Sequence, residues 1–129
     1  MTRKIAHVAV VVSDYDEALD FYINKLSFQL IEDTKLSDTK RWVIISPSGD
    51  DGTNILLAKA ANDKQTASIG NQTGGRVFLF LYTDNFWRDF EILKQHQIKI
   101  IREPQTEPYG TVAVFEDLYG NLWDLIQPT

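Results

Sequence analysis

The sequence predicts an α+β fold in which two β-α-β-β-β modules form an open, curved, mixed β-sheet. Two observations lead to this prediction. A strand, a helix and three further strands occur in that order twice along the 129 residues. In both copies an Asp, Asp14 or Asp84, follows the first strand and starts the helix. Since helices cover only one face of each sheet, we expect the other face to close around a cavity.

The first module covers about residues 4–60 and begins with a strand at 5–12 that is rich in β-branched residues. Asp14 and Glu17 then have the spacing of a capping box. Apolar residues at positions 15, 18, 19, 22 and 26 give the helix after this cap one apolar face. Three more strands, predicted at residues 28–33, 41–46 and 53–59, complete the module.

A polar linker at about residues 61–74 leads into the second module, at about 75–128, and both modules belong to one domain over residues 1–129. The module starts with a strand at 76–83, followed by a helix that Asp84-Asn85 caps and whose apolar face uses Phe86, Phe90 and Leu93. The remaining elements are a strand at 98–102, a loop with two prolines, and a closing hairpin of strands 111–115 and 121–127.

Composition and charge restrict the class of function. The net charge of −5 argues against nucleic acid as a partner, because binding to phosphates requires a basic face. Cysteine is absent, so neither disulfides nor zinc-thiolate sites are expected. No apolar run approaches the roughly eighteen residues of a membrane span. We therefore expect a cytoplasmic protein that binds a small molecule, with neither nucleic acid nor membrane as a partner.

Two ionisable residues lie inside apolar strands at opposite ends of the chain. His7 lies in the first strand and Asp124 in the last. Removing such a group from water is costly unless it finds a partner or its pKa shifts. We therefore expect His7 and Asp124 to face one cavity and to share an ion, a water or a hydrogen bond. The alternatives are a core histidine with a satisfied hydrogen bond, and a carboxylate paired with His7 or Arg76.

Three segments give the chain a resemblance to a known superfamily. These are His7-Val-Ala-Val-Val-Val-Ser-Asp14, Ala18-Leu-Asp-Phe-Tyr-Ile-Asn-Lys-Leu26 and Asp117-Leu-Tyr-Gly-Asn-Leu-Trp-Asp-Leu-Ile126. They resemble the vicinal oxygen chelate superfamily, which includes glyoxalase I, the bleomycin- and fosfomycin-resistance proteins and the extradiol dioxygenases. The resemblance implies the glyoxalase/bleomycin-resistance/dioxygenase fold and a homodimer, but it does not fix the reaction, because this fold supports many chemistries.

The resemblance also implies positions for metal ligands. It places His7 at the first ligand position, Leu56 at the second, Arg76 or Phe78 at the third and Asp124 at the last. Only His7 and Asp124 carry side chains suited to a metal, and a catalytic site needs about three protein ligands. The resemblance therefore implies either one divalent ion (Fe, Ni, Co, Mn or Zn) or no metal.

Aromatic residues on the predicted strands indicate a pocket for an apolar or aromatic ligand. The candidate ligand-binding residues are Trp42, Phe78, Tyr109 and Phe115, with Arg76 as an anchor for an anion. For each aromatic residue, packing in the core is the alternative. Two functions follow from these residues and the resemblance. One is a metal-dependent lyase, isomerase or dioxygenase that uses His7 and Asp124, and the other is a metal-free protein that sequesters a drug or metabolite.

Overall fold

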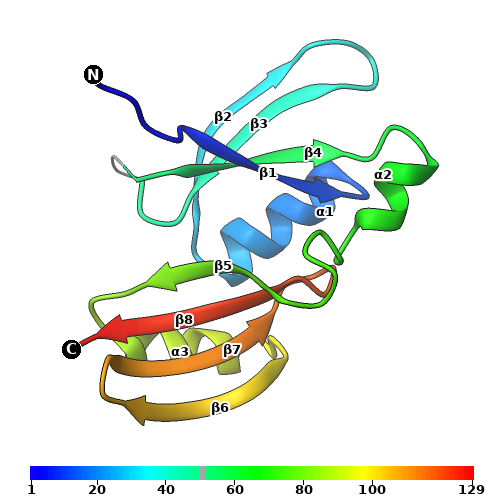
Figure 1. Cartoon of the computed structure of the whole chain (residues 1–129). Helices are drawn as coiled ribbons and strands as arrows, with labels where there is room; N and C mark the ends of the chain where they lie inside the picture. The colour runs from blue at the N-terminus through cyan, green and yellow to red at the C-terminus, as the bar shows by residue number, and fades with distance from the viewer. Residues whose placement is uncertain (50–51) are drawn as a thin grey trace. The chain divides into compact units, whose positions relative to one another are not determined.

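Two four-stranded mixed sheets form the framework of the computed structural model, which describes residues 1–49 and 52–129 (Figure 1). The strand orders are β1-β4-β3-β2 and β5-β8-β7-β6. In each sheet the first strand pairs in parallel with the last, and the remaining pairs are antiparallel. The predicted α+β fold with two β-α-β-β-β modules is confirmed. The sheets belong to two units, Met1–Ile69 and Gly70–Thr129, whose boundary lies within the residues predicted as linker.

The described residues of the first unit form seven elements. They are β1 (His7–Val12), α1 (Tyr15–Leu19), the π-helical turns η1 (Asp20–Lys25), β2 (Gln29–Lys35), β3 (Arg41–Ser46), β4 (Asn54–Lys59) and α2 (Asp63–Ser68). The side chain of Asp14 accepts a hydrogen bond from the backbone N–H of Glu17 at 2.8 Å, so the predicted cap of the first helix is present.

The core of the first unit lies between its sheet and α1-η1. Alternate residues of β1, β3 and β4 are buried on the side that faces the buried residues Tyr15, Ala18, Phe21 and Tyr22 of the helical segment; they are Val10, Val12, Val43, Ile45, Ile55 and Leu57. The residues between them point to the opposite side of the sheet, and on β3 the intervening Ile44 and Ser46 are buried too. We call this side the open face of the first sheet; it carries His7, Ala9, Trp42, Leu56 and Ala58.

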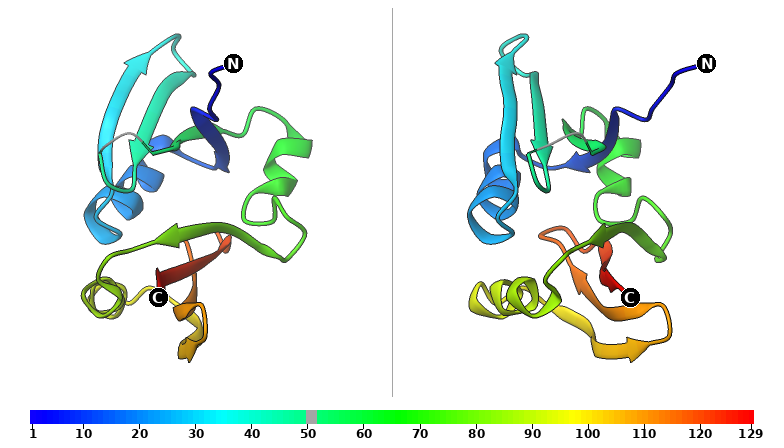
Figure 2. Two further views of the ribbon diagram at one scale, coloured as in Figure 1. Left: turned by 60° about the vertical axis from the view of Figure 1, so that its left-hand side comes forward. Right: turned by 90° about the vertical axis from the view of Figure 1, so that its left-hand side faces the viewer.

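Helix α2 was not predicted, because residues 61–74 are polar and lack an apolar periodicity. None of its residues is buried, and its start is fixed by Asn62, whose side chain accepts a hydrogen bond from the N–H of Gln65 at 2.9 Å. The helix follows β4 and lies beside β1 (Figures 1 and 2). Polar residues that the sequence assigned to a linker therefore form a wall next to the first sheet.

The second unit repeats the order of strand, helix and three strands. They are β5 (Val77–Tyr82), α3 (Phe86–Gln95), β6 (Ile100–Glu107), β7 (Gly110–Glu116) and β8 (Leu122–Pro128). The predicted apolar face of α3 is confirmed, since Phe86, Phe90 and Leu93 are all buried. Phe86 and Phe90 stack on each other with ring centroids 5.8 Å apart.

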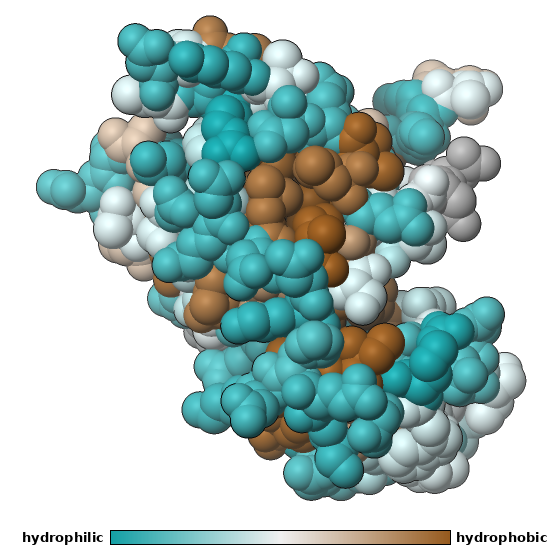
Figure 3. Space-filling view, turned by 180° about the vertical axis from the view of Figure 1, so that it is seen from behind, coloured by the Kyte–Doolittle hydropathy of each residue, from teal (hydrophilic) through white to brown (hydrophobic). Residues whose placement is uncertain are grey.

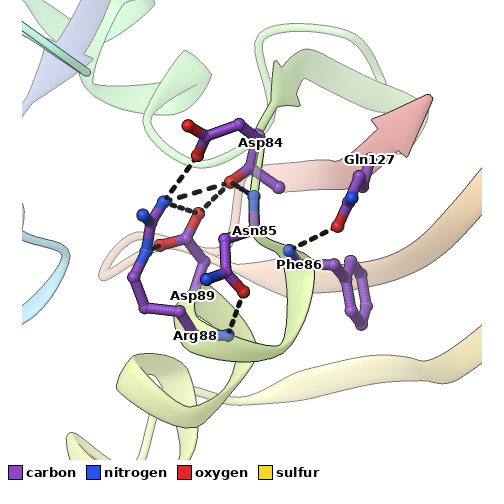
Figure 4. Close-up of polar contacts among 7 residues, drawn as sticks. Asp84, Asn85, Phe86, Arg88, Asp89 and Gln127 are labelled. Atoms are coloured by element: carbon purple, nitrogen blue, oxygen red, sulfur yellow. Dashed lines mark hydrogen bonds and ion pairs between the residues drawn. The ribbon is translucent and has the colours of Figure 1, made fainter.

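Side-chain hydrogen bonds stabilise the start of α3, and one of them connects it to β8 (Figure 4). Asn85, rather than Asp84, is the capping residue, and its side chain accepts from the N–H of Arg88 at 3.2 Å. The side chain of Gln127 on β8 accepts from the N–H of Phe86 at 2.8 Å. Arg88 pairs with Asp84 and Asp89, and this charge-assisted bonding raises the pKa of the Arg88 guanidinium.

Strand β6 is longer than predicted. The sequence suggested a loop after Arg102 because of its prolines, but β6 continues through Pro104 to Glu107. A proline is compatible with this strand for two reasons. β6 lies at the edge of its sheet, where one side needs no ladder partner, and its register with β7 shifts between Arg102 and Gln105.

Candidate functional site

The structure brings His7 and Trp42 together on the open face of the first sheet. Their ring centroids are 6.2 Å apart in an edge-on arrangement with an interplanar angle of 76°. Trp42 is half-buried, whereas His7 is exposed, which differs from the expectation of a buried imidazole. His7 is the first residue of an edge strand and points away from α1, so the core of this unit does not cover it.

Asn54 lies next to His7 in the sheet and has a buried polar atom without a partner. The two residues are in register across the parallel pair β1 and β4. The side-chain oxygen of Asn54 is buried and has no hydrogen-bond partner among the residues that the structure describes. Such an acceptor normally receives a hydrogen bond from a protein group, a water or a ligand. This part of the open face thus offers one acceptor and one imidazole.

A pocket of about 530 Å³ lies at the end of the first sheet where β4 leads into α2. Its volume is within the range of small-molecule sites. Four segments of the first unit form its wall, one at the start of α1, one around the start of β3, one along the end of β4 and one on α2. The residues are Tyr15, Thr39, Lys40, Arg41, Trp42, Leu56, Leu57, Ala58, Lys59, Ala60, Ala61 and Gln65. We call this the β3-β4 pocket.

Arg41 holds the rim of the β3-β4 pocket in place. Its guanidinium donates to both carboxylate oxygens of Asp33, at 3.1 and 2.6 Å, and to Asp16 at 2.9 Å. It also lies over the ring of Tyr15, 5.1 Å from the centroid, and its backbone N–H donates to the Tyr15 hydroxyl at 3.1 Å. The hydrogen bond from Arg41 lowers the pKa of Asp33, against the opposing effect of burial. The charge of Arg41 is thus offset within the protein.

Asp124 occupies the middle of the second sheet. On β8 it is in register with Phe80 of β5 and with Val114 of β7, so its sheet neighbours are hydrocarbon side chains. Burial raises the pKa of the Asp124 carboxyl, and the positive charge of Arg102 partly opposes this shift. Phe80 is 61% exposed and Tyr82, two residues along the same face, is 69% exposed. The second unit therefore presents an acid beside two exposed aromatic rings.

The other predicted site residues lie in different surroundings. Arg76 is exposed just before β5, and Phe78 is half-buried at a register shift between β5 and β8. Tyr109 is 60% exposed at the turn between β6 and β7. Phe115 is fully buried, and its ring stacks on that of Trp123 with centroids 5.8 Å apart. It therefore packs in the core, which was the alternative to ligand binding. His7 and Trp42 belong to the first unit and the other five residues to the second, so the shared cavity of His7 and Asp124 stays a prediction.

The C-terminal motif builds a turn. Asp117 is buried, and its carboxylate accepts hydrogen bonds from the N–H groups of Tyr119 and Asn121 at 3.0 Å each. It also accepts from the side-chain amide of Asn121 at 2.9 Å and from the indole N–H of Trp123 at 3.3 Å. This carboxylate therefore closes the β7-β8 hairpin that carries Asp124, and its bonding supports a structural role.

Within neither unit do the described residues gather the three ligand side chains of a metal site that the protein alone would hold. Position 56 on β4 carries a leucine, and the sheet neighbours of Asp124 are Phe80 and Val114, none of which coordinates metals. In residues 1–49 and 52–129 no three or more His, Cys, Asp or Glu side chains gather at a distance suited to one ion. We therefore derive no reaction step through a metal.

Sequence reasoning found Trp42 but missed most of the β3-β4 pocket. Lys40 and Lys59 lie at strand ends, where alternation gives no signal, and Gln65 belongs to the helix that was not predicted. The described part of the chain contains no helix that is long and apolar enough to cross a membrane.

Comparisons with known proteins give consistent results. The family model described as Glyoxalase/Bleomycin resistance protein/Dioxygenase superfamily matches residues 4–125. An uncharacterized protein of Shewanella frigidimarina is 60% identical over 98% of this chain and 95% of its own length. The crystal structure of UcmS2 has a TM-score of 0.84 at 29% identity and covers 98% of both chains. The crystal structure of TnmS3, an antibiotic binding protein from Streptomyces sp. CB03234, has a TM-score of 0.80 at 30% identity, over 99% of this chain and 98% of that one.

Proposed function

Because this chain belongs to the glyoxalase/bleomycin resistance protein/dioxygenase superfamily, we propose that it binds and sequesters a small, flat, apolar or aromatic molecule without using a metal. The observation that carries the proposal is the β3-β4 pocket, where Trp42 lies beside the aliphatic side chains of Leu56 and Ala58, and where Tyr15 also lines the wall. Apolar walls with a few polar groups are the usual composition of small-molecule sites. The likeness to TnmS3, an antibiotic binding protein, supports the same class of function.

The proposal is tested by binding of aromatic compounds to the intact protein. We expect compounds of two or three fused rings to raise the melting temperature, and the shift should grow with the logarithm of ligand concentration above the Kd. Trp42→Ala should abolish this shift. Trp87→Ala is the matched control, because Trp87 is 60% exposed on α3 and does not line the pocket. A library without hits, or equal responses in both variants, would contradict the proposal.

A metal-dependent enzyme of the same superfamily is the second candidate. It is favoured by one observation, the unpartnered oxygen of Asn54 beside the imidazole of His7. The two candidates differ in their response to Ni, Co, Mn, Fe(II) and Zn. Under the proposed function none of these ions raises the melting temperature, whereas an enzyme that uses His7 would gain stability that His7→Ala removes.

We also propose a homodimer. Each four-stranded sheet has two edge strands, and large apolar side chains are exposed on them, among which are Leu30 and Ile31 on β2 and Phe80 on β5. The back of the molecule shows apolar side chains at the surface among hydrophilic ones (Figure 3). A second copy of the chain would cover such surface.

A further inference from the structure

We infer that the β3-β4 pocket selects flat aromatic ligands that carry an anionic group, an inference that rests on the proposed function and names its ligand class. Several residues that line the pocket are positively charged. Three described lining residues, Lys40, Arg41 and Lys59, are basic, and none is Asp or Glu, although the chain as a whole has a net charge of −5. A positive site on an acidic protein concentrates anionic ligands.

Only some of these positive charges are available to a ligand. The single positive charge of Arg41 faces two carboxylates, Asp33 and Asp16, so Arg41 adds no net positive charge to the pocket. Lys40 and Lys59 form no ion pair within 4.0 Å among residues 1–49 and 52–129. Asp38, the acidic residue nearest to Lys40 in the sequence, pairs with Lys35 instead, at 3.5 Å. The two lysines are therefore the cations that a ligand meets.

Neutral polar side chains of the pocket also offer hydrogen-bond donors to a ligand. The amide oxygen of Gln65 accepts the N–H of Ala61 at 2.8 Å, which leaves the NH₂ group of Gln65 to donate. The Tyr15 hydroxyl accepts from the N–H of Arg41, which leaves its own proton to donate. Carboxylates, sulfonates and phosphates accept such hydrogen bonds. A cationic ligand would be repelled by the lysines and would face hydrogen-bond donors instead of acceptors.

Trp42 indicates that the ligand contains an aromatic ring. Trp42 lines the pocket, and Leu56 and Ala58 lie on the same face of the sheet as Trp42. Stacking on the indole and burial against these aliphatic groups favour a planar ring system. The volume of about 530 Å³ accommodates two or three fused rings with a substituent.

The experiment compares 2-naphthoate with 2-naphthamide, which have the same rings and nearly the same shape but differ in charge. Isothermal titration calorimetry at low salt should give naphthoate an affinity about tenfold or more higher than naphthamide. Lys40→Gln and Lys59→Gln should each lower the naphthoate affinity about fivefold and leave the naphthamide affinity unchanged. Lys40→Arg and Lys59→Arg should retain the preference, and added salt should reduce it.

Lys94→Gln, on the exposed surface of α3, is the matched control and should not alter either affinity. Equal affinities for the two probes, both lost in Trp42→Ala, would overturn the charge selection while leaving the proposed function intact. A naphthoate preference that survives in the Lys40→Gln/Lys59→Gln double variant would also overturn it. Binding of neither probe at millimolar concentration would overturn the inference, and a wider library without hits would in addition contradict the proposed function.

Discussion

Replacing Gly70 by alanine should destabilise the protein more than replacing Gly74, although the two glycines have similar backbone conformations. Their φ angles are +73° and +69°. A Cβ atom on Gly70 would lie 1.9 Å from the backbone oxygen of Tyr119, whereas at Gly74 no described atom lies within 4 Å of the added Cβ. Tyr119 belongs to the turn that Asp117 closes, so the comparison measures how tightly this turn packs.

The expected loss in the free energy of unfolding has two contributions. A side chain in the left-handed region costs about 1 kcal/mol at either position. The clash at Gly70 involves backbone and cannot be relieved by rotating a side chain, which adds about 2 kcal/mol. We therefore expect the free energy of unfolding to fall by about 3 kcal/mol in Gly70→Ala and about 1 kcal/mol in Gly74→Ala.

The assay is urea denaturation followed by tryptophan fluorescence, with the slope m checked for both variants. A difference of about 2 kcal/mol with unchanged m supports the packing of the Tyr119 turn against Gly70. Losses that agree within about 0.5 kcal/mol would refute the reasoning, because the shared conformational term would then explain both variants.

Four further outcomes are expected. Asp117→Ala should lower the free energy of unfolding by about 3 kcal/mol in urea titrations, because the N–H of Asn121 and the indole N–H of Trp123 lose their buried acceptor; a loss below about 1 kcal/mol would count against this. The pKa of Asp33 is lowered by Arg41, so Asp33→Asn should cost at most about 1 kcal/mol at neutral pH. The stability difference between Asp33→Asn and the original protein should vanish as the pH falls below 3.8, the ordinary pKa of an aspartate. A stability difference that does not change with pH would contradict this prediction. The pKa of Asp124 is raised by burial, so Asp124→Asn should stabilise the protein at neutral pH, and the gain should disappear as the pH falls to 3.8; a loss of stability at neutral pH would show instead that the carboxylate has a favourable partner. Light scattering at micromolar concentration should give twice the chain mass of 14.8 kDa, and a stable monomer would refute the dimer.

The fold was predictable because its signals are local and repeated. Caps at Asp14 and Asn85, apolar helix faces and strands rich in β-branched residues all agree with the final topology. Helix α2 escaped prediction because it is stabilised by a cap and lacks an apolar face. The extension of β6 escaped because proline is a strong loop signal, and only its edge position makes it compatible with a strand.

The candidate site was less predictable, since it depends on which strand ends meet. The aromatic residues on the predicted strands suggested Trp42 as a pocket residue. Nothing in the sequence indicated that Lys40 and Lys59 line the same pocket, because Lys40 precedes β3 and Lys59 ends β4. His7 was expected to be buried because its neighbours in the sequence are apolar, yet it starts an edge strand and is exposed. Burial of Phe115 follows from its position opposite Trp123, which depends on the register of the hairpin.

The central claim is that the β3-β4 pocket of the first unit holds an aromatic ligand. Intermolecular nuclear Overhauser effects between 2-naphthoate and the labelled protein test it most directly. We predict contacts from the naphthalene protons to the indole of Trp42 and to the methyl groups of Leu56 and Ala58. Contacts confined to the exposed rings of Phe80 and Tyr82 in the second unit would contradict the claim.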